Sequence, residues 1–264
     1  MSLKLQEEYG DAINVVFVEV GNRPDTYVQQ FMIQHKWMGG RSVWTREPPF
    51  ETGFNYIPVG VLLSSDGKVL IRGNPIELHP KIKNAIDADI DAQRKAPKGV
   101  PDVVGKALVD FHKGNYAKAL ASLQVIVDKP PVKDPEGLLP AAKKAIDDFN
   151  AKIDARFARV QSLIDGGWFA EATAQLGEIA KAVKGNDELT RRQAEVLAKL
   201  QADSLKTERE AADALAKLER KLYDKGPDNA TAKALEALAK KYEGTKAAER
   251  ATELAEIAKE DKES

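Results

Sequence analysis

The sequence predicts an α/β domain followed by an all-α helical region. Residues 1–96 contain β-branched apolar runs, more than half of the aromatic residues and abundant Gly and Pro. Residues 102–264 are instead rich in Ala, Lys, Glu and Leu, with apolar residues at helical spacing. The segment 97–101, PKGVP, has a proline at each end, and proline disfavours helix in the residue before it. We therefore expect 97–101 to be a linker between two domains.

The first domain is expected to alternate helices and strands. Segment 13–20 is nearly all apolar and β-branched, which is typical of a strand covered on both faces. A second buried strand is expected at 58–64, and the Asp66-Gly67 turn returns the chain into a partner strand at 69–71. Helices are expected at 3–9, 25–37 and 76–95. This order has no strand before the first helix, where a sheet of this kind normally has one.

The second domain shows helical periodicity at 103–111, 116–127, 138–164, 169–183, 188–223, 230–242 and 246–257. Segment 114–119 (GNYAKA) matches 167–172 (GWFAEA), and each pairs a glycine turn with a helix rich in small residues. This similarity predicts helical hairpins of the tetratricopeptide (TPR-like) type. The charged stretch 188–223 is expected to be a long hairpin arm, a coiled-coil segment or a plain amphipathic helix.

Composition excludes several kinds of chemistry. The chain has no cysteine, which removes thiol catalysis, disulfides and Cys-ligated metals. Its 40 Lys+Arg balance 41 Asp+Glu, so no bulk charge attracts nucleic acid. The histidines His35, His79 and His112 are far apart, and no Walker loop, G-x-S-x-G or dinucleotide-binding glycine motif occurs. No apolar run is long enough to span a membrane. We expect no catalytic residue, no metal and no cofactor in this chain.

Four segments of the first domain, taken together and in this order, indicate a known fold. Residues 5–11 (LQEEYGD) end a helix, 15–20 form a strand, Tyr56-Ile57-Pro58 precedes a strand, and 62–73 form a hairpin. Together they resemble the thioredoxin-like fold, and more narrowly the extracytoplasmic thiol-disulfide oxidoreductases and redoxins of bacteria. The resemblance covers residues 3–95.

The resemblance implies a role for Ile57 and Pro58, because they match the position of the family's cis-proline loop, which pairs with extended substrate backbone. We expect the Ile57–Pro58 bond to be cis. The family's Cys-x-x-Cys would fall upstream of Met1, which predicts that the chain is the remainder of an oxidoreductase and is itself redox-inactive. The alternative is a complete, non-catalytic protein-binding module. Localisation is extracytoplasmic by resemblance, and cytoplasmic if the chain is complete.

Four aromatic residues are candidates for protein interaction. Trp44 lies in the irregular segment before the Ile57-Pro58 pair, and Tyr116, Trp168 and Phe169 follow the glycine turns of the helical hairpins. The alternative for Trp44 is packing over a sheet edge, and for the other three a role as wedges between helices. The expected partners are proteins or peptides, with the oligomeric state left open.

Overall fold

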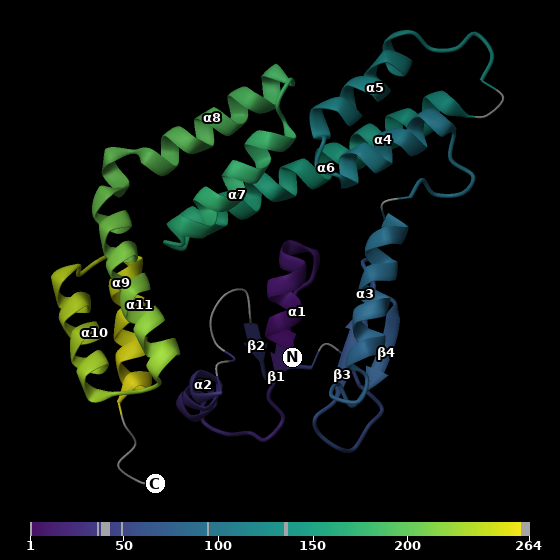
Figure 1. The fold of residues 1–264 in the computed structure, drawn as a ribbon. Coiled ribbons are helices and arrows are strands. Elements are labelled where there is room, and N and C mark those ends of the chain that lie inside the picture. Colours follow the sequence, from purple (N-terminus) through teal and green to yellow (C-terminus); the bar gives the residue numbers. More distant parts are fainter. Residues whose placement is uncertain are drawn as a thin grey trace. The chain divides into compact units, whose positions relative to one another are not determined.

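The computed structural model describes residues 2–35, 37, 43–48, 50–93, 95–134 and 137–259 (Figure 1). It is mostly helical (67%), with a small strand portion divided between two sheets. This confirms the helical character predicted for the C-terminal region. None of the described helices is both long and apolar enough to cross a membrane. Backbone contacts divide the chain into two compact units, Met1–Ile90 with Glu210–Ser264 and Asp91–Arg209.

The N-terminal part of the first unit contains the mixed elements. In chain order these are α1 (Ser2–Tyr9), the 3-10 turn η1 (Gly10–Ala12), β1 (Val16–Val18), α2 (Asp25–Gln34), β2 (Val43–Thr45), β3 (Gly60–Leu63), β4 (Val69–Gly73) and α3 (His79–Gln93). The helix expected to reach residue 37 ends at Gln34, and Asp25 is its first residue. Residues 97–101, the expected linker, contain no helix or strand.

The strands form two separate two-stranded sheets. β1 pairs with β2 in parallel, with Phe17 opposite Trp44, and β3 pairs with β4 antiparallel, with Leu62 opposite Ile71. The prediction that 13–20 is covered on both faces is wrong, because Val16 is 51% and Val18 38% exposed. The regular part of this strand is only three residues long, and β2 is its one partner among the described strands, so its valines lack a covering layer.

The last helices complete the first unit. They are α9 (Lys206–Lys225), whose first four residues belong to the second unit, α10 (Asn229–Lys241) and α11 (Lys246–Ala258). Their buried faces share one hydrophobic cluster that includes Leu215, Leu235 and Ala251, and Ile33 of α2 belongs to the same cluster. Within this unit, α2 contacts α11, which begins more than 200 positions later in the chain.

The second unit is built from consecutive helices that pack on one another. These are α4 (Asp102–His112), α5 (Tyr116–Asp128), α6 (Leu138–Asp165), α7 (Phe169–Ala182) and α8 (Asp187–Gln201). Each contacts the next, and α4 also contacts α6, as the labelled ribbons in Figure 1 show. Fully buried side chains such as Leu123, Phe149 and Leu176 fill the space between them.

The two matching segments of the sequence have matching conformations. Gly114 has φ 81° and Gly167 has φ 78°, so both occupy the left-handed region that favours glycine. The aromatic residues that follow, Tyr116 and Phe169, are 5% and 6% exposed. The internal similarity read from the sequence therefore corresponds to a repeated helix–turn–helix geometry.

The segment 188–223, expected to be a long hairpin arm, a coiled-coil segment or a plain amphipathic helix, is divided between two helices. Helix α8 ends at Gln201, and a 3-10 turn at Asp203–Leu205 separates it from α9. The guanidinium of Arg209 donates hydrogen bonds to the carbonyls of Leu200 (2.8 Å) and Ala202 (2.9 Å). These bonds satisfy carbonyls that lose their helical partners where α8 ends, which stabilises the break.

Candidate protein-binding surface

Exposed apolar side chains are concentrated in the N-terminal part of the first unit. Most of the large exposed hydrophobic residues in the described chain lie between positions 16 and 76. They are Val16, Val18, Val20, Tyr27, Phe31, Trp37, Phe50, Phe54, Tyr56, Ile57, Leu63, Val69, Leu70 and Ile76. Where such side chains lie side by side, an exposed apolar patch is typical of a site that binds another molecule.

The loop before β3 carries three neighbouring exposed apolar side chains, those of Phe54, Tyr56 and Ile57. The rings of Phe54 and Tyr56 lie 5.2 Å apart, and the guanidinium of Arg72, on β4, lies 5.8 Å above the Phe54 ring. Ile57, next in the chain, is 77% exposed. The Ile57–Pro58 bond is cis, as expected. We call Phe54, Tyr56, Ile57, Pro58 and Arg72 the Pro58 surface.

The Pro58 surface was only partly foreseen from the sequence. Ile57 and Pro58 were candidates by resemblance, whereas Phe54, Tyr56 and Arg72 were not. The alternation of Phe54 and Tyr56 just before Pro58 is the signal that would have indicated an aromatic platform. Arg72 gave no such signal, because only the pairing of β3 with β4 brings it to the loop.

A second aromatic group packs on β1. The ring of Trp37 stacks on Phe17 at 5.3 Å and lies edge-on to Phe31 at 5.5 Å. His35 contacts both Phe31 and Trp37. The Trp37 indole is 40% exposed, so its inner face packs on the strand while its outer edge faces solvent. This group extends the apolar surface over the β1–β2 sheet.

Trp44, a candidate for protein interaction, lies on β2 and is half-buried. The guanidinium of its neighbour Arg46 lies 5.6 Å from the Trp44 ring. Arg46 also forms an ion pair with Glu19 (2.8 Å) and a second one with Asp25. One side chain therefore connects the ends of β1, β2 and α2, and Trp44 belongs to this anchored segment.

The other three candidate aromatics lie in the second unit and differ in exposure. Tyr116 and Phe169 are buried at the starts of α5 and α7, and the Tyr116 ring stacks on Phe111 at 4.3 Å. Trp168, which precedes α7, is 38% exposed. Tyr116 and Phe169 therefore pack between helices, while Trp168 presents part of its ring to solvent.

Two pairs of polar side chains connect α1 to α3 in the first unit. The Tyr9 hydroxyl donates to Oδ1 of Asp87 at 2.7 Å, and Lys83 forms an ion pair with Glu8. Desolvation, followed by the hydrogen bond to Asp87, raises the pKa of Tyr9 to about 12. These are contacts between helices. In the part of the chain that is described, no group of three His, Asp or Glu side chains is placed to hold a metal ion.

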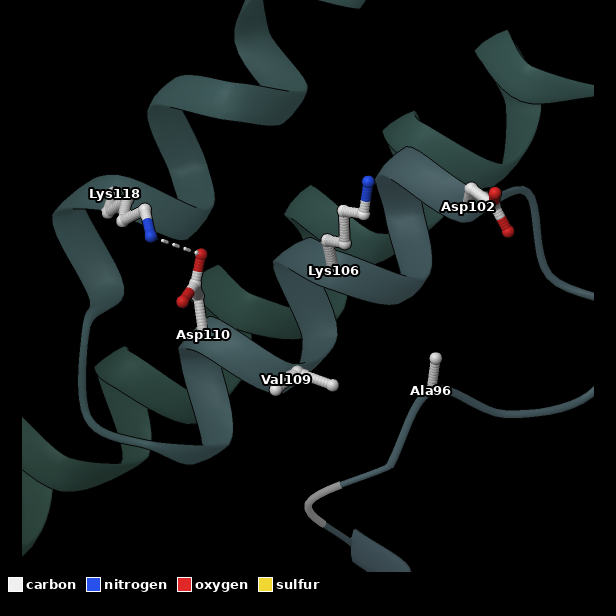
Figure 2. A pocket seen from close by; sticks show the side chains of 6 residues that line it. All are labelled: Ala96, Asp102, Lys106, Val109, Asp110 and Lys118. Carbon is white, nitrogen blue, oxygen red and sulfur yellow. Dashed lines mark ion pairs between the residues drawn. The ribbon is translucent and has the colours of Figure 1, made fainter.

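One depression lies in the second unit, beside α4 and α5 (Figure 2). It measures about 450 Å³ and is lined by Ala96, Asp102, Lys106, Val109, Asp110 and Lys118. Lys118 points toward Asp110 and forms an ion pair with it at 3.0 Å. The lining mixes two acids with two lysines and is open to solvent, so its charges do not select a ligand of either sign.

Comparisons with known proteins give no relative from which a function can be transferred. No family model matches the chain, and neither the curated proteins nor the solved structures searched contain a match.

Proposed function

We propose that this chain binds extended segments of other proteins, and that the Pro58 surface is the binding site in its first unit. The observation that supports this most strongly is the exposure of Ile57, which is 77% open to solvent beside the Phe54–Tyr56 pair. Aromatic and apolar groups of this kind bind polypeptide by burying apolar area at a small cost in side-chain entropy.

The position of the surface also favours an extended partner. Pro58 lies two residues before β3, and β3 pairs with β4 on one side. An extended segment lying along the loop and β3 would gain main-chain hydrogen bonds by strand addition, while its side chains contact the exposed rings. The resemblance to thioredoxin-like proteins, whose corresponding loop pairs with extended substrate, supports the same proposal.

The chemistry proposed for this chain is binding without thiol exchange. Its 264 residues contain no cysteine, so a redox reaction would need a thiol pair from outside them. The resemblance to thiol-disulfide oxidoreductases favours an account in which the chain holds a polypeptide substrate for such a reaction. In the alternative account, binding is itself the function, with the repeated helical hairpins as a second interaction region.

The test is binding of an unfolded protein, with carboxymethylated α-lactalbumin as a fluorescently labelled probe. Ile57→Asp places a charge in the apolar surface and is expected to weaken binding at least about tenfold, since apolar contact area is lost and a carboxylate is desolvated. Val125→Asp is the matched control, because Val125 is 62% exposed on α5, in the other unit. Equal binding by Ile57→Asp and the unmodified protein would overturn the proposal.

A further inference from the structure

Three aromatic rings form a stack where α4, α5 and α6 meet. Phe111 at the end of α4 lies between Phe149 of α6 (4.0 Å between ring centroids) and Tyr116 of α5 (4.3 Å). All three residues are buried. The hydroxyl of Tyr116 has no hydrogen-bond partner among the described residues, although its ring is covered. The stack is thus a buried aromatic layer in which one hydroxyl is unpaired within the described residues.

Two cationic side chains of α6 lie near this stack and form no ion pair within the described residues. Lys152 and Arg156 are four residues apart on α6, so they project from the same side of the helix, and both are exposed. The Arg156 guanidinium lies 5.5 Å from the centroid of the Tyr116 ring. Neither side chain makes an ion pair within the described parts of the chain. His112, at the end of α4, is close enough to Lys152 for its pKa to be lowered, first by burial and then by this charge.

Two acids in this part of the second unit form ion pairs with other lysines. Glu178, within electrostatic reach of Arg156, forms an ion pair with Lys181 at 2.8 Å. Asp110 pairs with Lys118 at 3.0 Å. Asp148 lies one turn before Lys152 on α6 and makes no ion pair with it. Lys152 and Arg156 therefore carry positive charges that no ion pair within the described residues neutralises.

We propose that His112, Lys152 and Arg156, with the Tyr116 hydroxyl, form a docking site for an acidic segment of a partner protein. Glutamate and aspartate carboxylates complement Lys152 and Arg156, and the arginine offers paired donors to a carboxylate. The Tyr116 hydroxyl adds a donor at the edge of the stack. This site lies in the second unit, goes beyond binding at the Pro58 surface and does not depend on it.

The imidazole makes docking depend on pH. Protonation of His112 adds a third positive charge beside Lys152, so an acidic segment binds more tightly as pH falls through the pKa of His112. A bound carboxylate favours the protonated imidazole in return and raises that pKa. Lys152 of α6 lies within electrostatic reach of His112, and the His112 ring meets the Phe111 ring edge-on at 6.4 Å between centroids.

The test uses hexaglutamate as the probe, followed by NMR of the full-length, isotope-labelled chain. Hexaglutamate is expected to shift the resonances of residues 111–116 and 149–156 and to raise the pKa of His112, whereas neutral hexaglutamine does neither. The double variant Lys152→Glu/Arg156→Glu is expected to bind hexaglutamate at least about tenfold more weakly, because both attractions become repulsions.

The matched control is Lys143→Glu/Lys144→Glu. It makes the same change in net charge on the same helix, at two exposed lysines that have no ion pair among the described residues. It is expected to retain binding within about twofold, because Lys144 lies about 12 Å along the helix from Lys152, which is more than the Debye length at physiological salt. Equal loss in the two double variants, shifts confined to other residues, or no binding of hexaglutamate would each overturn the proposal.

Discussion

The side-chain amide of Gln30, on α2, donates a hydrogen bond to the backbone carbonyl of Ile257, near the end of α11, at 3.1 Å. It also reaches the carbonyl of Lys259 at 3.2 Å. The last carbonyls of a helix have no partner within that helix, so a side chain from elsewhere in the fold can cap them. This contact joins residues 227 positions apart and ties the C-terminal helices to the N-terminal part of the first unit.

Replacing Gln30 is expected to loosen this connection. Gln30→Ala leaves the two carbonyls without their donor and is expected to lower the free energy of unfolding by about 1 kcal/mol. Hydrogen exchange should become faster at the end of α11. Gln34→Ala is the control, because Gln34 is an exposed glutamine of the same helix. A Gln30→Ala variant as stable as the Gln34→Ala variant would show that the cap contributes nothing.

Ile33 tests the packing of α2 on the C-terminal helices. Its side chain is 1% exposed and belongs to the cluster formed by α9, α10 and α11. Ile33→Ala is expected to cost about 2–5 kcal/mol, because it leaves a cavity in this cluster. Denaturant unfolding measures the loss. Ile76→Ala, at a position 73% exposed, should change the stability by less than about 0.5 kcal/mol. Similar small losses in both variants would contradict the packing described.

The glycine turns of the repeated hairpins give a third prediction. A Cβ at Gly114 would meet no atom within 4 Å, so Gly114→Ala is penalised only by its φ of 81°. We expect a loss of about 1 kcal/mol. Gly177, inside α7 and equally uncrowded, lacks a positive φ, so Gly177→Ala should stabilise the protein by about 0.5–1 kcal/mol. Thermal unfolding should therefore shift in opposite directions, and shifts of the same sign would refute this account of the turn.

The cap of α10 predicts a dependence on pH. The carboxylate of Asp228 accepts hydrogen bonds from the Thr231 hydroxyl and from the Thr231 backbone N–H, and these bonds lower its pKa. The folded state therefore holds this proton less tightly than the unfolded state. The resulting stability is fully present above the usual aspartate pKa, about 3.9, and is lost as pH falls through the lower folded value.

Asp228→Asn removes this titration while keeping a capping acceptor. At neutral pH the variant is expected to be less stable by about 0.3–1 kcal/mol, because a negative charge at the helix N-terminus is lost. The difference from the unmodified protein should shrink below about pH 4. Asp224→Asn, at an exposed aspartate just upstream, is the control and should show no such trend. A difference that stays constant down to acid pH would show that Asp228 does not titrate as described.

Local patterns predicted the elements better than their packing. The hairpin at 58–71 and the helix 138–164 were located within a few residues, because turn residues and apolar periodicity are properties of neighbouring positions. β2 was not foreseen, since three residues carry too little pattern. The break at Ala202 was missed because Arg209 stabilises it from the next helix.

The candidate binding site, like the fold, was predicted from the sequence only in part. Ile57 and Pro58 were named from an ordered set of motifs, and they lie on an exposed surface. The positions of their neighbour Arg72 and of the cap formed by Gln30 depend on contacts between distant segments. A single sequence gives no signal for such contacts. The burial of Tyr116 likewise depends on Phe111 and Phe149 closing around it.

Hydrogen exchange of the full chain, with and without carboxymethylated α-lactalbumin, tests the central claim most directly. Binding of an extended segment at the Pro58 surface predicts slower exchange at residues 54–63, because their backbone becomes covered and β3 gains hydrogen bonds. The Ile57→Asp variant should lose this protection, whereas Val125→Asp should keep it. Protection confined to other parts of the chain, or none at saturating probe, would contradict the claim that this surface binds extended protein segments.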